Sequence, residues 1–143
     1  MSNKKKQKKL NEIFLDTYIG MDKVCCRKFG VAIGGVTEYV NRLINARNAP
    51  GRDEALTRLV KYRSTRNKIA HERGALENIS DISKSDIKWI ERFTKSVERK
   101  KDPYFSYLKK ARRRIRGRKA LKVVIIAAVI LIAAAVAAFF ILK

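Results

Sequence analysis

The chain has 143 residues, and its 34 lysines and arginines against 13 acidic residues give a formal net charge of +21. Once the strongly basic ends are set aside, about 90 residues remain, which is enough for one small domain and excludes a second. The only two cysteines, Cys25 and Cys26, are adjacent, which excludes a disulfide framework and a zinc site; we expect no metal, no cofactor and at least one thiol in the core.

Most of the excess charge lies near the two ends of the chain. Residues 1–10 hold five basic residues and residues 104–122 hold nine, with no acidic residue in either stretch. We interpret residues 1–7 as a basic tail that suits either a lipid or a nucleic-acid partner. The stretch between the two ends has a moderate charge, which is typical of a folded domain with a basic face.

Two helices are predicted in the first part of the domain. Apolar residues recur at spacings of three and four over residues 8–29, and the glycines of residues 30–35 mark a boundary. A second helix starts near Thr37 and ends before the breaker at residues 48–51. The apolar positions of these two helices are Leu10, Ile13, Phe14, Met21, Val24, Cys25, Tyr39, Val40, Leu43 and Ile44.

Two further helices complete the predicted bundle, which covers residues 8–102. The third begins near Asp53 and ends before Gly74, with apolar positions that include Leu59 and Val60. The fourth begins at Ser83 to Asp86, whose side chains suit an N-cap, and stops near residues 102–103. No segment alternates with a period of two, so the expected fold class is an all-α bundle of about four helices.

The end of the third helix carries a group of residues that suits phosphodiester chemistry. His71, the only histidine, can accept and return a proton near neutral pH, and Asn67 lies four residues before it on the same face. The guanidinium of Arg66 can bind a phosphate through paired hydrogen bonds and stabilise developing charge. The alternative is a structural or exposed histidine at a helix C-terminus, where its cation suits the helix dipole.

The segment Arg66-Asn67-Lys68-Ile69-Ala70-His71 resembles the signature of the HEPN superfamily, which is arginine, a polar residue, three variable positions and histidine. The resemblance implies a dimeric all-α bundle and a metal-independent endoribonuclease of the toxin or phage-defence type, with Arg66 and His71 catalytic and Asn67 supporting. It also leaves open a non-catalytic adaptor, tethered to a membrane, that binds RNA, a nucleotide or a protein. Basic residues on the same helix are consistent with an RNA partner, or simply with a solvated face; they are Arg58, Lys61, Arg63 and Lys68.

The last part of the chain is predicted to be a basic helix over residues 103–122 and a transmembrane helix over residues 123–142. The second stretch contains no charged or polar residue, and twenty helical residues rise about 30 Å, the thickness of the hydrocarbon layer. Basic residues stay on the cytosolic side, so we expect a single-pass protein with a cytosolic N-terminus and its C-terminus on the far side.

The basic helix is predicted to lie at the membrane surface. Its charges would attract anionic lipid headgroups, each by about 1 kcal/mol, and a lipid-binding scaffold is a further alternative function. The residues assigned to this surface are Lys109, Lys110, Arg112, Arg113, Arg114, Arg116, Arg118, Lys119 and Lys122.

Overall fold

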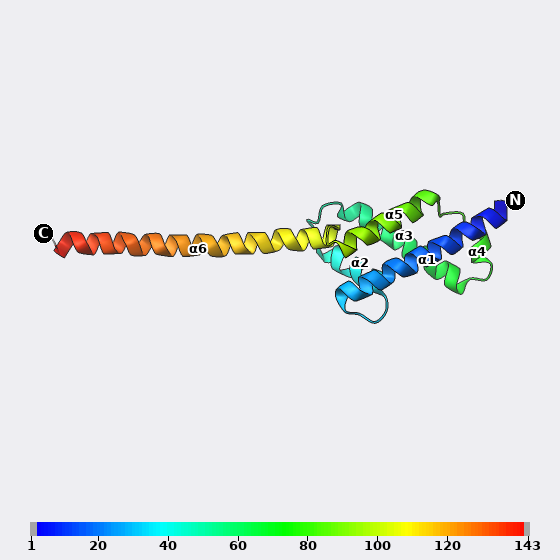
Figure 1. Ribbon diagram of the computed structural model, residues 1–143, viewed down its shortest axis with the longest axis horizontal. Coiled ribbons are helices and arrows are strands. Elements are labelled where there is room, and N and C mark those ends of the chain that lie inside the picture. The colour runs from blue at the N-terminus through cyan, green and yellow to red at the C-terminus, as the bar shows by residue number, and fades with distance from the viewer. Residues whose placement is uncertain (1–2, 142–143) are drawn as a thin grey trace. The chain divides into compact units, whose positions relative to one another are not determined.

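The computed structural model describes residues 3–141, and the side chains of residues 3–134. The helices of this part of the chain are accompanied by no strand, so the predicted all-α class is confirmed (Figure 1). Its helices are α1 (Asn3–Phe29), α2 (Gly35–Asn45), α3 (Arg52–His71), α4 (Ala75–Asn78), α5 (Lys84–Glu98) and α6 (Pro103–Ile141). The chain divides into two compact units, Met1–Tyr107 with the bundle and Leu108–Lys143 with most of α6.

Helix α1 contacts each of the four helices that follow it. Its buried side chains recur three and four residues apart and therefore form one stripe along the helix; they are Asn11, Phe14, Tyr18, Met21, Val24 and Cys25. The burial of Cys25 confirms the prediction of a thiol in the core. Because α1 begins at Asn3, the lysines at positions 4–9 lie on this helix and do not form a separate tail.

A chain of aromatic rings connects α1, α2, α3 and α5 through the core. The Phe14 and Tyr62 ring centroids are 6.0 Å apart, and those of Tyr62 and Trp89 are 5.6 Å apart. Trp89 stacks on Phe93 at 4.7 Å, and Phe93 meets the edge of the Tyr39 ring at 5.2 Å. Such pairs stabilise a core by about 0.5–1.5 kcal/mol each beyond the burial of their area. These rings therefore fix the position of four helices.

Three side chains that were predicted on apolar helix faces lie at the surface instead. Ile13, Ile44 and Val60 are 43%, 49% and 44% exposed. Leu43, directly before Ile44, is fully buried, because one residue along a helix turns the side chain by about 100°. The buried stripe is therefore narrower than the run of apolar residues in the sequence.

Helix α2 starts in very close contact with the backbone of α1. A Cβ atom added at Gly35 would lie 2.3 Å from the Asp22 carbonyl oxygen and 2.3 Å from the Cys26 backbone nitrogen. The Asp22 side chain also accepts a hydrogen bond from the Val36 N–H at 2.8 Å, which satisfies one of the free N–H groups at a helix start. A glycine at position 35 thus lets the two backbones touch.

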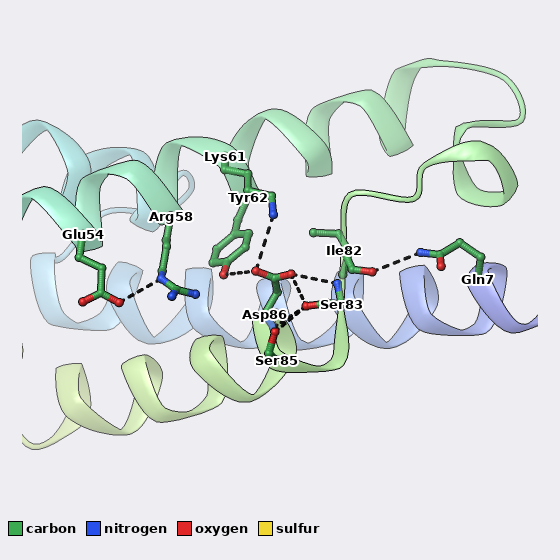
Figure 2. A network of polar contacts seen from close by, with 9 residues as sticks. All are labelled: Gln7, Glu54, Arg58, Lys61, Tyr62, Ile82, Ser83, Ser85 and Asp86. Atoms are coloured by element: carbon green, nitrogen blue, oxygen red, sulfur yellow. Dashed lines mark hydrogen bonds and ion pairs between the residues drawn. The ribbon is translucent and has the colours of Figure 1, made fainter.

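The predicted N-cap of α5 is confirmed and also joins α5 to α3 (Figure 2). The Ser83 N–H and hydroxyl donate to Asp86 Oδ2 at 2.9 and 2.6 Å, and the Asp86 N–H donates to Ser83 Oγ at 3.3 Å. This reciprocal arrangement is a capping box. Asp86 Oδ1 accepts from the Tyr62 hydroxyl at 2.8 Å and lies 3.7 Å from Lys61 Nζ.

We expect Asp86→Asn to reduce the pH dependence of stability. Burial alone would raise the pKa of Asp86, but hydrogen bonds from Ser83 and Tyr62 and the charge of Lys61 lower it below 3.8. The contribution of the Asp86 carboxylate to the free energy of unfolding is therefore complete above its pKa in the unfolded chain. This contribution is lost as the pH falls through the lower pKa that Asp86 has in the folded chain. Urea unfolding, followed by circular dichroism, should show a loss of about 1–2 kcal/mol at about pH 7 and a smaller loss at about pH 2.5. An equal loss at both pH values would contradict this prediction.

Asp102 caps the start of α6 from inside the bundle and is 1% exposed. Its Oδ1 atom accepts from the Tyr39 hydroxyl at 2.5 Å and from the N–H groups of Tyr104 and Phe105 at 3.1 and 3.3 Å. Its Oδ2 atom is buried and has no hydrogen-bond partner among the described residues. Burial raises the pKa of Asp102, because the carboxylate is poorly solvated there. Asp102 therefore joins α6 to α2 while holding a carboxylate away from water.

The prediction of a membrane span is wrong. Within the part of the chain that the structure describes, no helix has both the length and the apolar character needed to cross a bilayer. The predicted single-pass topology, with the C-terminus on the far side of a membrane, is therefore wrong as well, and the bilayer partner that depended on it is not supported. From residue 135 on, the predicted span lies outside the described side chains.

Candidate functional site

The three residues predicted to be catalytic lie on the last turns of α3, but they are not brought together. Arg66 is half-buried and donates from Nη1 to Asn67 Oδ1 at 3.2 Å. His71 is the final residue of the helix and is exposed. Five residues along a helix correspond to a rotation of about 140°, so Arg66 and His71 point in different directions. No hydrogen bond joins Asn67 to His71 within the described residues, and the catalytic roles stay a prediction.

The four basic residues predicted to bind RNA fall on different sides of α3. Arg58 pairs with Glu54 at 3.1 Å, and its guanidinium lies 5.3 Å from the centre of the Trp89 ring. Lys61 pairs with Asp86 at 3.7 Å (Figure 2). Both side chains thus already take part in the contact between α3 and α5. Lys68 is exposed, and Arg63 is half-buried on the side of α3 that faces α1.

Arg63 and Arg66 line a hollow of about 850 Å³ between α3, the second half of α1 and residues 32–37. We call this hollow the arginine groove. Its volume lies within the range of about 300–1,000 Å³ that is typical of small-ligand pockets. Side chains of α1 complete its charged lining; they are Asp22, Lys23 and Arg27. The groove therefore combines four basic side chains with one carboxylate.

The basic side chains of the arginine groove are largely available to a ligand. Within the described chain, neither Lys23 nor Arg63 has an acidic side chain within ion-pair distance, and Arg27 has only a distant one, Glu98 at 3.7 Å. The carboxylate of Asp22 is already used by the start of α2. Paired guanidinium groups without carboxylate partners are well suited to bind phosphate, since each can donate two parallel hydrogen bonds.

Tyr18 adds a neutral hydrogen-bond donor to the floor of the arginine groove. Burial raises the pKa of Tyr18 to about 12; Asp22 acts in the same direction, while Arg66 and Arg63 act against it. The hydroxyl therefore keeps its proton at neutral pH. It has no hydrogen-bond partner within the described residues, although Tyr18 is only 5% exposed.

Sequence reasoning missed the contribution of α1 to this groove. It placed the basic surface on α3 alone, whereas Tyr18, Lys23 and Arg27 lie about 40 residues earlier in the chain. The available signal was the spacing of Lys23 and Arg27, four residues apart on the polar side of an amphipathic helix. That pattern predicts a shared face but not which helix lies opposite.

No group of three or more metal-ligating side chains occurs within the described part of the chain. Burial raises the pKa of the Cys25 thiol to about 12, so this buried side chain is a poor thiolate ligand. Cys26 lines the arginine groove, where its thiol lies 3.8 Å from Asp22 Oδ2.

The nine basic residues of α6 that were assigned to a membrane surface, from Lys109 to Lys122, are exposed. They belong to the second compact unit, Leu108–Lys143. Their role at anionic lipid headgroups stays a prediction.

Comparison with known proteins identifies a family but no activity. No curated protein and no solved structure matches the chain. The sequence model of one family, described as a family of unknown function (DUF6548), matches residues 12–122, which include the whole bundle after the first turns of α1. This match is not to the HEPN superfamily, so the resemblance drawn from Arg66, Asn67 and His71 is wrong. The chain belongs to the DUF6548 family.

Proposed function

We propose that the helical bundle binds RNA, with backbone phosphates held in the arginine groove. The observation that carries this proposal is the position of Arg63 and Arg66, two half-buried guanidinium groups without carboxylate partners in the described chain. Lys23 and Arg27 on α1 supply further positive charge. The release of counterions from a nucleic acid would favour binding at such a surface.

Two further features of the groove favour RNA over DNA. The Tyr18 hydroxyl and the Asn67 side-chain amide can both form hydrogen bonds with a ribose 2′-hydroxyl, the group that distinguishes RNA from DNA. A groove of this size accommodates one or two nucleotides of a single strand, not the width of a duplex.

Binding without cleavage is the form of the proposal that the geometry supports best. The endoribonuclease prediction required Arg66 and His71 to act on one phosphate, but Arg66 lines the groove and His71 is not among its lining residues. With the HEPN resemblance withdrawn, only the chemistry of the individual side chains favours catalysis. Incubation with RNA in EDTA separates the two functions: cleavage that disappears in His71→Ala would replace the binding proposal by the nuclease.

We expect Arg63→Ala combined with Arg66→Ala to weaken RNA binding by about 10- to 100-fold. Each removed phosphate contact costs about 1 kcal/mol or more and lowers the dependence of log K on log salt by about 0.7 for a single strand. Fluorescence anisotropy of a labelled RNA of about 12 nucleotides, titrated with the full chain at several salt concentrations, measures both quantities.

A second pair of arginines provides a matched control. Arg47 and Arg92 are exposed and do not line the arginine groove, so Arg47→Ala with Arg92→Ala removes the same charge elsewhere. Equal loss of affinity in both double variants would show binding to the overall positive charge, and no RNA binding by the wild type would refute the proposed function. DNA of the same sequence should bind more weakly than the RNA.

A further inference from the structure

A second hollow, of about 700 Å³, lies on the first half of α1 beside the start of α5. The residues of α1 that line it include Asn3, Lys6, Leu10 and Ile13, each three or four positions from the next. This spacing places them in one line along the helix, about 15 Å long. Together with Lys9 and Lys84, we call this line the lysine stripe. It is separate from the arginine groove, whose lining on α1 begins at Tyr18.

The segment before α5 contacts α1 beside the lysine stripe. Gln7, which also lines the hollow, donates from Nε2 to the Ile82 carbonyl oxygen at 3.4 Å (Figure 2). Ile82 is buried in the core, so this contact places the start of α5, with Lys84, next to α1. The hollow is therefore formed by two helices whose relative position the core fixes.

The floor of the lysine stripe is apolar. Leu10 is half-buried and packs against the core, and Ile13 is 43% exposed although it belongs to the apolar residues of α1. The buried stripe of α1, with Asn11 and Phe14 fully buried, runs directly beside Leu10, and Ile13 lies at its exposed edge, since one residue along a helix turns the side chain by about 100°. The bundle thus leaves this edge of the apolar face of α1 uncovered.

The rim of the lysine stripe is positive and unpaired. Lys6, Lys9 and Lys84 are exposed, and within the described residues no acidic side chain lies within ion-pair distance of any of them. Lys8 differs, because it points to the other side and pairs with Glu77 at 2.8 Å. A surface that combines two apolar side chains about one helical turn apart, Leu10 and Ile13, with a lysine rim is complementary to an amphipathic helix that carries acidic residues beside its apolar face.

We propose that the lysine stripe binds an acidic amphipathic helix of another protein. The apolar side chains of that helix would cover Leu10 and Ile13, and its carboxylates would face the three lysines. A second copy of this chain fits poorly, since a net charge of +21 makes two copies repel each other. RNA also fits poorly, because the floor offers aliphatic side chains and no aromatic ring for stacking.

A designed peptide tests this proposal with the full chain. The probe is a fluorescein-labelled helical peptide of about 15 residues with leucines at i, i+3, i+4 and i+7 and glutamates elsewhere. A peptide of the same composition with its leucines scattered around the helix keeps the charge but loses the apolar face. We expect the first peptide to bind at least tenfold more tightly than the second.

Two matched variants locate the binding. Ile13→Asp should weaken peptide binding at least tenfold. Ile44 is similarly exposed but lies on α2, away from the lysine stripe, so Ile44→Asp should leave peptide binding unchanged. Equal binding of the two peptides, equal binding by both variants, or no binding by the wild type would overturn the proposal. A dimeric wild type that becomes monomeric in Ile13→Asp on sedimentation would instead identify a second copy of this chain as the occupant. Displacement of the peptide by RNA, if it depended on Lys6 and Lys9, would identify RNA as the occupant.

Discussion

Gly35→Ala should destabilise the bundle by about 3–5 kcal/mol, which is a large part of the total stability of a small domain. The added methyl group would lie 2.3 Å from two backbone atoms of α1, and backbone atoms cannot move aside as a flexible side chain can. Helix α2 would have to shift away from α1 and lose the hydrogen bond from the Val36 N–H to Asp22. Thermal unfolding followed by circular dichroism should show a midpoint at least about 12 °C lower.

The same substitution at Gly20 is the matched control. Gly20 lies inside α1, and a Cβ atom there would meet nothing within 4 Å. Because alanine favours a helix over glycine by up to about 1 kcal/mol, Gly20→Ala should raise the midpoint slightly. If Gly35→Ala unfolded at the wild-type temperature, the backbones of α1 and α2 would not lie as close together as described at Gly35.

Asp102→Ala should destabilise the chain by about 2–3 kcal/mol near neutral pH. The loss of the cap exposes free N–H groups at the start of α6, and the buried Tyr39 hydroxyl loses its acceptor. The substitution also removes the cost of burying a charged carboxylate, which the raised pKa of Asp102 reflects. This gain offsets part of the loss in stability. A raised pKa means that the stabilising contribution of Asp102 is full in acid and declines as the pH rises through the folded value. Urea unfolding at several pH values measures this trend, which is opposite to that of Asp86.

A double-mutant cycle separates the cap from its partner. Tyr39→Phe keeps the ring against Phe93 at 5.2 Å and removes only the hydroxyl. If the hydrogen bond between Tyr39 and Asp102 stabilises the fold, the loss of unfolding free energy in the double variant should be smaller than the sum of the losses in the two single variants. We expect this difference to be at least about 0.5 kcal/mol. Strict additivity, or an Asp102→Ala variant as stable as the wild type, would show that this contact contributes nothing.

The helical content of the bundle was predictable because local patterns determine it. The spacing of apolar residues predicted α1, α2, α3 and α5, and the pair Ser83 and Asp86 predicted the N-cap of α5. Such signals depend on residues within one or two turns of each other. The exact width of each buried stripe was less predictable, as Ile13 and Ile44 show, because it depends on how the neighbouring helices are placed.

The candidate site was predictable only in part, because it is formed by helices that are distant in sequence. Arg66 was identified, but its partners Lys23 and Arg27 belong to α1, and only the folded bundle places them opposite α3. The contacts of Arg58 with Trp89 and of Lys61 with Asp86 could not be predicted for the same reason, since they depend on where α5 lies. A six-residue motif could not predict these contacts, nor the family to which the chain belongs.

The aromatic chain through the core has a practical consequence for spectroscopy. Trp89 is the only tryptophan in the sequence, so the tryptophan fluorescence of the whole chain comes from one indole ring. That ring is stacked on Phe93, lies beside Tyr62 and is covered by the guanidinium of Arg58. Its emission therefore reports directly on whether α3 and α5 are in contact. A change in tryptophan emission thus distinguishes the separation of these two helices from changes elsewhere in the chain.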